Sequence, residues 1–231
     1  MPMEKEPFDR RRLITSTAAT LVVLLLWLFV PAGTLGWLRG WLFFVVTVVA
    51  GIVLSIYLRR VNPDIFAARV NRRTGTKSWD KGIVVLLISV MTSVIPVAAL
   101  DDGRFHWSLV PWWVCAIGYA LFLVGLVGMA WAEAVNKFFE PTVRIQTDRG
   151  HHVIDSGPYA IVRHPGYLSA SPLVVGMALS LGSYWALIPA VLCCLILFVR
   201  TVLEDRTLQA ELPGYREYAQ RVRYRLMPGV W

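Results

Sequence analysis

The stretch Pro165–Val199, PGYLSASPLVVGMALSLGSYWALIPAVLCCLILFV, consists of two apolar segments separated by Gly182-Ser183. Neither segment, Pro165–Leu181 or Tyr184–Val199, contains an Asp, Glu, Lys or Arg residue. Inside a lipid bilayer every backbone polar group must find its partner within the protein, and an apolar segment achieves this as a helix. The sequence therefore predicts two short membrane helices joined as a tight hairpin.

Four further apolar stretches precede this hairpin. A spanning helix needs about 20 mostly apolar residues, with roughly 17–25 acceptable. Charged residues make up only 16% of the chain and hydrophobic residues 56%, whereas a soluble domain carries about 25% charged residues. The stretches are Leu13–Val30, Gly40–Leu58, Gly82–Leu100 and Trp107–Ala132. We predict an all-α, polytopic integral membrane protein with about six transmembrane helices.

No repeat or long linker divides the chain, so residues 1–231 are expected to form one membrane domain. Residues 13–132 supply four spans, and residues 133–231 supply a polar loop expected to bind a cofactor, the hairpin and a charged tail with a cytoplasmic helix. Between the second and third spans, Asn62–Arg69 has Asn at a possible N-cap and Pro at the first helical position. That pattern favours a short interfacial helix.

The basic residues are distributed unevenly along the chain. Six crossings place 21 of the 23 Lys and Arg residues on one side, and only Arg39 and Arg104 on the other. The excess of positive charge marks the cytoplasmic side, which then holds both termini. The same face favours contact with anionic headgroups of membrane lipids. The net charge of +8 is explained by topology, and we expect no nucleic-acid partner.

Three cysteines, Cys115, Cys193 and Cys194, lie within the apolar spans. They form no Cys-x-x-Cys pair and have no His partner at the spacing of a metal site. We expect them to be small core residues, and we expect no metal site.

A polar segment at the start of the hairpin concentrates residue types that bind ligands. Residues 157–167 read GPYAIVRHPGY. Pro165 suits the first position of the following helix, which puts Arg163 and His164 just ahead of its N-terminus. The unpaired N–H groups of that end attract an anion. Tyr159 and Tyr167 add aromatic faces that can stack on a flat ring or attract a cation.

Charged residues at the other end of the hairpin form the opposite candidate. Arg200, Glu204 and Glu211 share a helical face, and Asp205 lies about 100° round the helix. Ionisable groups at a membrane boundary are candidates for function, but a solvated helix with an Arg200–Glu204 pair explains the pattern equally well. Because the hairpin arms have nearly equal length, residues 157–167 and 200–211 are expected to meet and form one pocket.

Together these motifs resemble the isoprenylcysteine carboxyl methyltransferase family, which is related to membrane phospholipid N-methyltransferases. The resemblance extends over Asn136–Trp231. It rests on Gly157-Pro158-Tyr159, Arg163-His164-Pro165-x-Tyr167, Glu204-Asp205 and Gly214-Tyr215-x-x-Tyr218. The family commonly has Glu-Glu where this chain has Glu-Asp, and the shorter reach of Asp205 makes its role less certain than that of Glu204.

The resemblance implies S-adenosylmethionine as methyl donor, bound near the inner membrane face. The absence of a Gly-x-Gly-x-x-Gly motif after a strand agrees with a site that is not a Rossmann sheet. Glu204 would face the amino or ribose groups of the cofactor. The matching positions that would enclose the cofactor are Gly157, Pro158, Tyr159, His164, Pro165 and Tyr167.

The catalytic candidates are Arg163, Arg200, Glu204 and Asp205. The acceptor would be lipophilic or a small molecule, and the sequence leaves its chemistry open. A carboxylate needs no base, and Arg163 or Arg200 would orient it. An amine or a thiol would lose its proton to Glu204 or Asp205.

Two other functions remain open. Membrane NADPH-dependent reductases of the sterol-reductase type share a similar C-terminal arrangement, but they are usually longer and have more spans. A non-catalytic membrane subunit with the same fold is the third possibility. Such a subunit would have no need of an Arg-His-Pro entrance together with a carboxylate pair.

Overall fold

The computed structural model describes residues 10–63, 65 and 75–231, with side chains from Thr15 onward. These residues form helices and connecting segments without any β-strand. The helix expected over Asn62–Arg69 falls largely outside them, and Asn62 itself ends the second helix. The helices are α1 Arg10–Ala32, α2 Leu38–Val61, α4 Ser78–Ala98, α5 Trp112–Val135, α6 Pro165–Ser180, α7 Leu187–Glu211 and α8 Tyr215–Arg221.

The fold is that of an all-helical integral membrane protein. Within the described residues, five helical stretches are long and apolar enough to cross a membrane. Helix α6 has only 16 residues, which at about 1.5 Å per residue gives roughly 24 Å, less than the ~30 Å hydrocarbon core. The five stretches are Thr15–Ala32, Leu38–Val61, Ser78–Phe105, Trp112–Val135 and Leu187–Glu211.

Helices α5 and α6 pack closely because glycines allow their backbones to approach. A Cβ atom added at Gly118 would lie 2.3 Å from the backbone N of Ser180, and one at Gly176 would lie 2.3 Å from the backbone N of Phe122. Small residues at helix contacts are typical of membrane bundles, where van der Waals packing replaces the hydrophobic effect. This contact fixes the position of α6, the helix that begins at the polar segment.

Helix α7 joins the last predicted span to the helix expected over Arg200–Glu211. The apolar run and the charged residues after Val199 belong to one continuous helix of 25 residues. The helix continues because its first charged residues are buried with partners: Arg200 is 4% exposed, and Asp205 is fully buried. Arg200 is paired with Asp80 of α4, so the alternative of an Arg200–Glu204 surface pair is wrong.

The third and fourth spans also have different boundaries from those predicted. Helix α4 continues as a π-helical segment, η1 Ala99–Phe105, and α5 begins only at Trp112. Asp101 in η1 is fully buried and accepts hydrogen bonds from the backbone N–H and hydroxyl of Ser108 and from the Ser183 hydroxyl. These bonds hold the connection at this end of the bundle in a compact form.

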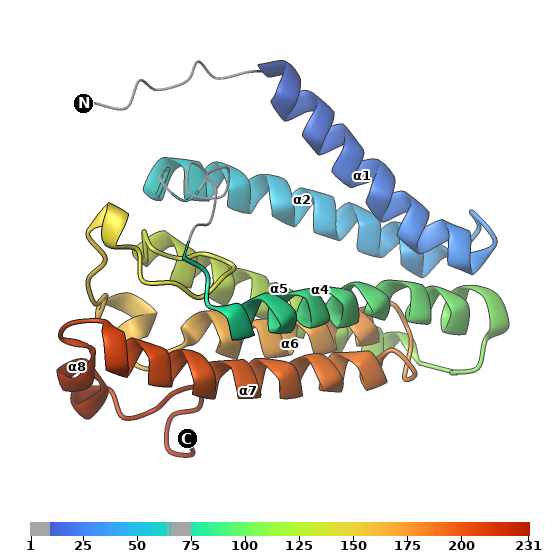
Figure 1. Ribbon diagram of the computed structural model, residues 1–231. Helices are drawn as coiled ribbons and strands as arrows, with labels where there is room; N and C mark the ends of the chain where they lie inside the picture. Colours follow the sequence, from blue (N-terminus) through green and yellow to red (C-terminus); the bar gives the residue numbers. More distant parts are fainter. Residues whose placement is uncertain (1–9, 64, 66–74) are drawn as a thin grey trace.

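Figure 1 shows α4, α5, α6 and α7 lying side by side, with α2 and the inclined α1 along one side of them. The segment between α5 and α6 lies at the same end of the bundle as α8 and the C-terminal end of α7 (Figure 1). The start of α6 and the end of α7 are therefore brought together at one end, as the hairpin predicted.

Candidate functional site

The segment that leads into α6 is shaped by a short 3-10 turn, η3 Gly157–Ala160. Gly157 has a φ of +57°, and a Cβ there would lie 2.9 Å from Val135, so this position suits glycine. The turn buries Tyr159, whose hydroxyl accepts a hydrogen bond from the Asn136 side chain at 3.0 Å. Burial raises the pKa of this tyrosine, which keeps its hydroxyl protonated.

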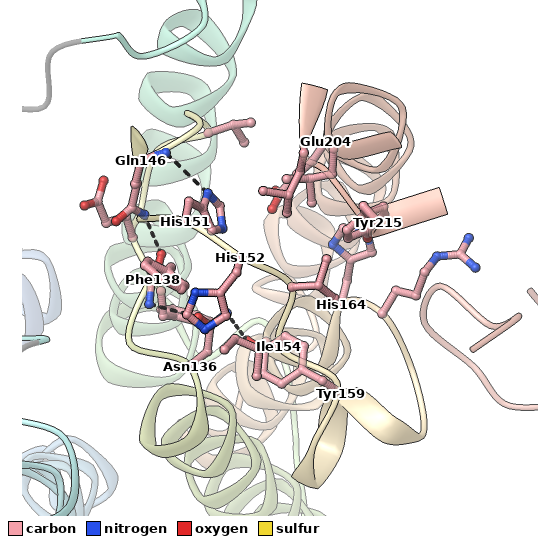
Figure 2. Close-up of a pocket in the computed structure, with 18 of the residues that line it drawn as sticks. Asn136, Phe138, Gln146, His151, His152, Ile154, Tyr159, His164, Glu204 and Tyr215 are labelled. Atoms are coloured by element: carbon pink, nitrogen blue, oxygen red, sulfur yellow. Dashed lines mark hydrogen bonds between the residues drawn. The ribbon is translucent and has the colours of Figure 1, made fainter. Parts of the chain in front are cut away.

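A cavity opens where this segment faces α7 and α8. Its volume is about 830 Å³, part of it open to solvent. The loop wall comes from residues 136–154, in the first part of the segment between α5 and α6, and the helical wall comes from residues 159–167 together with α7 and α8 (Figure 2). The loop wall includes Asn136, Phe138, Phe139, Glu140, Arg144, Gln146, His151, His152 and Ile154. The helical wall includes Tyr159, Arg163, His164, Pro165, Gly166, Tyr167, Glu204, Leu208, Tyr215 and Tyr218.

Glu204 is the carboxylate of the helical wall. It accepts a hydrogen bond of 2.5 Å from the Tyr167 hydroxyl, and it forms no ion pair among the residues the structure describes. The His164 ring stacks parallel to the Tyr167 ring, with centroids 5.8 Å apart. This chain of contacts fixes the Glu204 carboxylate while leaving its charge free to attract a cationic ligand.

The loop wall carries its own internal ion pairs. The Glu140 side chain, only 2% exposed, binds the Arg144 guanidinium at 2.9 and 3.0 Å. The hydrogen-bonded Glu140 raises the pKa of Arg144. Arg149 approaches the same carboxylate at 3.7 Å. The charge of Glu140 is thus neutralised within the loop, in contrast to that of Glu204.

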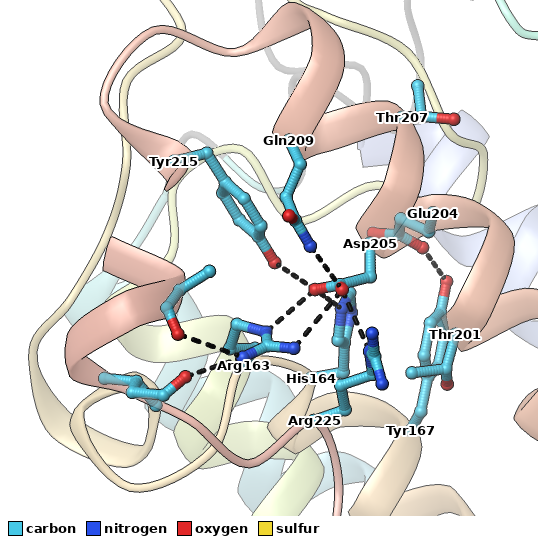
Figure 3. Close-up of polar contacts among 12 residues, drawn as sticks. Arg163, His164, Tyr167, Thr201, Glu204, Asp205, Thr207, Gln209, Tyr215 and Arg225 are labelled. Carbon is cyan, nitrogen blue, oxygen red and sulfur yellow. Dashed lines mark hydrogen bonds and ion pairs between the residues drawn. The ribbon is translucent and has the colours of Figure 1, made fainter. Parts of the chain in front are cut away.

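Next to Glu204, Asp205 occupies a fully buried position and is surrounded by donors (Figure 3). Arg163 binds it through Nε at 2.8 Å and Nη2 at 3.2 Å, and Arg225 binds it through Nε at 2.9 Å. Its carboxylate also lies 3.4 Å from His164 Nε2 and accepts from Gln209 at 2.8 Å and Tyr215 at 3.2 Å. Asp205 therefore ties together the start of α6, α7, α8 and the tail.

The tail after α8 also binds the start of α6 through its backbone. The N–H groups of Arg163 and His164 donate to the carbonyls of Tyr224 and Arg225, each at 2.9 Å. The Arg163 side chain donates to the Val222 carbonyl at 2.8 Å. The residues ahead of the α6 N-terminus are thus held by the tail on one side and by Asp205 on the other.

Arg200, about one turn before Asp205 in α7, is likewise buried and bound by partners inside the protein. Its guanidinium binds Asp80 at 2.8 and 3.1 Å and the Pro141 carbonyl at 2.6 Å. Asp80, which is fully buried, also accepts from the Val143 N–H at 2.6 Å. Arg200 therefore anchors the loop wall to α4 and α7.

The predicted site residues fall into two groups. The cavity is lined by Tyr159, Arg163, His164, Pro165, Tyr167 and Glu204. Gly157, Pro158, Arg200 and Asp205 are not among the lining residues. Direct catalytic roles for Arg200 and Asp205 are not supported by this geometry, because both side chains are buried and engaged by partners inside the protein.

The sequence predicted that this loop binds the cofactor, but it did not identify individual residues of the loop wall as site residues. The polar residues Asn136 and Gln146 beside Phe138 were the available signal. Gln146 is 2% exposed and donates to the Phe138 carbonyl at 2.7 Å. Such folding of an irregular loop onto itself leaves no regular spacing in the sequence.

Comparison with known families bears on this whole region. Residues 113–212 match the family model described as phospholipid methyltransferase. The match begins in α5, includes the loop wall and the parts of the helical wall that precede α8, and ends just after α7. It confirms the relationship that the motifs indicated and, with the apolar helices, supports a membrane methyltransferase in general. No individual curated protein matches the chain.

Proposed function

We propose that this protein is an integral membrane methyltransferase that uses S-adenosylmethionine and methylates a lipophilic or small-molecule acceptor. The observation that carries the proposal is the position of Glu204. It is a cavity-lining carboxylate without an ion pair among the described residues, at the end of the helical hairpin and inside the region of the family match.

The residues of the cavity fit the chemistry of this cofactor. Glu204 suits an ammonium group or ribose hydroxyls, and the start of α6 suits a carboxylate. The rings of Tyr159, Tyr167 and Phe138 provide aromatic faces. When bound, S-adenosylmethionine supplies a methyl group activated by its positive sulfonium.

The residues of the chain act mainly by alignment. Holding two reactants in line can contribute about 7–11 kcal/mol in favourable cases. Tyr167 and His164 fix the Glu204 carboxylate, while Arg163 and Asp205 hold the segment that carries His164. A carboxylate acceptor needs no base. For an amine or thiol acceptor, Glu204 is the group that contacts the cavity and accepts the proton.

We further propose six spans with both termini in the cytoplasm, within one membrane domain of residues 1–231. The distribution of 21 basic residues against two supports this topology. Helix α6, with its 16 residues, would then be the shortest span and would place the cavity at the cytoplasmic boundary. The basic face would contact anionic lipids, without a nucleic-acid partner.

Equilibrium binding to the detergent-purified protein tests the cofactor. We expect S-adenosylhomocysteine to bind and to be displaced by S-adenosylmethionine, while NADPH fails to bind. Binding of NADPH without S-adenosylhomocysteine would overturn the proposal in favour of a reductase. Binding of neither would favour a non-catalytic subunit.

A further inference from the structure

The tail after α8 folds into a compact loop beside α7. The Trp231 carbonyl accepts three successive backbone N–H groups, those of residues 225–227, at 3.0, 3.1 and 3.3 Å. Gly229, with a φ of +80°, allows the turn that brings Trp231 back to this position. Figure 1 shows the tail leaving α8 and returning to lie beside α7. These hydrogen bonds join residues 225–231 into one unit.

The Trp231 ring lies against the exposed apolar face of α7. It stacks on the Phe198 ring, with centroids 4.3 Å apart. Phe198 is 47% exposed, and its neighbours Leu195 and Val199 are also exposed. This face ends where the charged residues of α7 begin at Arg200. Because Trp is enriched where a span meets the membrane–water interface, the ring occupies the position that such a residue favours.

The same unit exposes further apolar side chains. Met227 is 53% exposed and Val230 is 77% exposed, although both belong to the loop closed by Trp231. Arg223, just ahead of the unit, is also exposed, and its charge suits anionic headgroups. A surface that combines apolar and basic side chains fits the boundary of a bilayer. It is continuous with the lipid face of α7 through the stacked rings.

Arg225 connects this surface to the cavity. Its guanidinium lies over the Trp231 ring, 4.9 Å from the centroid, and its Nε binds Asp205 at 2.9 Å. Its backbone carbonyl accepts the N–H of His164 at 2.9 Å, and His164 lines the cavity. Figure 3 shows Arg225 next to Asp205 and His164. Displacement of the unit would remove a partner from both of these residues.

We propose that residues 225–231 dock into the membrane interface through Trp231, Met227 and Val230, and that this docking positions the start of α6 for cofactor binding. The partner is the lipid surface at the end of the bundle that holds the cavity. Trp231 is a positioning residue, which acts through Arg225. The docking stands on the surface alone, whereas the positioning role rests on the proposed function.

A spin label at position 230 tests the docking without any cofactor. With the native cysteines replaced, Val230→Cys is labelled in nanodiscs of equal parts phosphatidylcholine and phosphatidylglycerol. We expect this label to be more accessible to oxygen, which concentrates in lipid, than to a water-soluble nickel chelate. Glu217→Cys, at an exposed charged position of α8, is the matched control and should show the reverse. Equal accessibility profiles at the two positions would overturn the docking.

The positioning role is tested by titrating S-adenosylhomocysteine into the same nanodiscs. For Trp231→Ala we expect an affinity about three- to tenfold lower, as for the loss of one aromatic pair. Trp231→Phe keeps a ring that stacks on Phe198 and should stay within about twofold of the unmodified protein. Trp185→Ala removes an exposed Trp at the opposite end of the bundle and should have no effect. Thermal unfolding checks that each variant is folded.

Three results would contradict these expectations. Unchanged affinity in folded Trp231→Ala overturns the positioning role. The same loss in Trp231→Phe as in Trp231→Ala also overturns it, because the stacked ring would then not be what matters. If the unmodified protein fails to bind S-adenosylhomocysteine, the proposed function fails and the positioning role fails with it, while the spin label still decides the docking.

Discussion

At the residue scale, Glu204 and Asp205 are neighbours with the same charge and opposite environments. Asp205 is fully buried and bound by Arg163, Arg225, His164 and two neutral donors. Glu204 faces the cavity with a tyrosine hydroxyl as its partner. Successive residues of a helix point about 100° apart, which is enough to separate a structural carboxylate from one that can meet a ligand.

Replacement of Asp205 by Asn should therefore damage the fold. Removing one partner of a buried ion pair leaves the others uncompensated and costs about 3–5 kcal/mol. We expect Asp205→Asn to lower the free energy of unfolding by that amount, measured by denaturant unfolding in detergent. Glu204→Gln serves as the control and should change stability little. Equal stability of Asp205→Asn and the unmodified protein would contradict the assigned structural role.

The pH dependence of stability should carry a signature of His151. Burial lowers the pKa of the folded ring to about 4, from an ordinary value of 6.5. Because the folded-state pKa is depressed, the contribution to stability is present above pH 6.5 and is lost as the pH falls through 4. Between pH 7.5 and 4, the free energy of unfolding should fall less steeply with pH in His151→Gln than in the unmodified protein. An unchanged pH profile in that variant would show that the ring titrates normally.

At the scale of the elements, the α5–α6 contact depends on glycines. Gly176→Ala would push a Cβ against the Phe122 backbone. We therefore expect the free energy of unfolding to fall by about 1–3 kcal/mol, the usual effect of overpacking. Gly51→Ala on α2 is a matched control, since nothing lies within 4 Å of its added Cβ. A destabilised control with an unaffected Gly176→Ala would contradict this packing.

The sequence predicted the hairpin and the meeting of its two ends, because both follow from apolar length and from a short turn. It also predicted a helix over Arg200–Glu211, but it did not predict that two charged residues of this helix, Arg200 and Asp205, are buried. The partners that bury its charged residues, Asp80 for Arg200 and Arg225 for Asp205, come from other parts of the fold. Residue types beside a span end cannot reveal a partner 120 residues away.

The same limit applies to the site. Tyr159, His164, Tyr167 and Glu204 could be named from motifs that resemble a family. The loop wall could not, because His151 acquires its place from the backbone of Gln146 and from the Phe138 ring. Irregular loops have no period that shows which side chains turn inward.

At the scale of the whole molecule, the proposed topology predicts that the two ends of the bundle lie on opposite sides of the membrane. Leu109, 89% exposed, lies at one end, and the tail position Gly229 lies at the other. With the native cysteines replaced, Leu109→Cys should react with an impermeant reagent only from outside, and Gly229→Cys only after permeabilisation. Labelling of both from the outside would contradict six crossings.

The central claim is that the cavity between the loop wall and α6–α7 binds S-adenosylmethionine through Glu204. Calorimetric titration of S-adenosylhomocysteine into the purified protein and into Glu204→Gln tests it most directly. Loss of a hydrogen bond to a charged group is worth about 1.5–3 kcal/mol, so we predict affinity roughly ten- to a hundredfold weaker in the variant. Equal affinity in both proteins, or no binding by the unmodified protein, would contradict the claim.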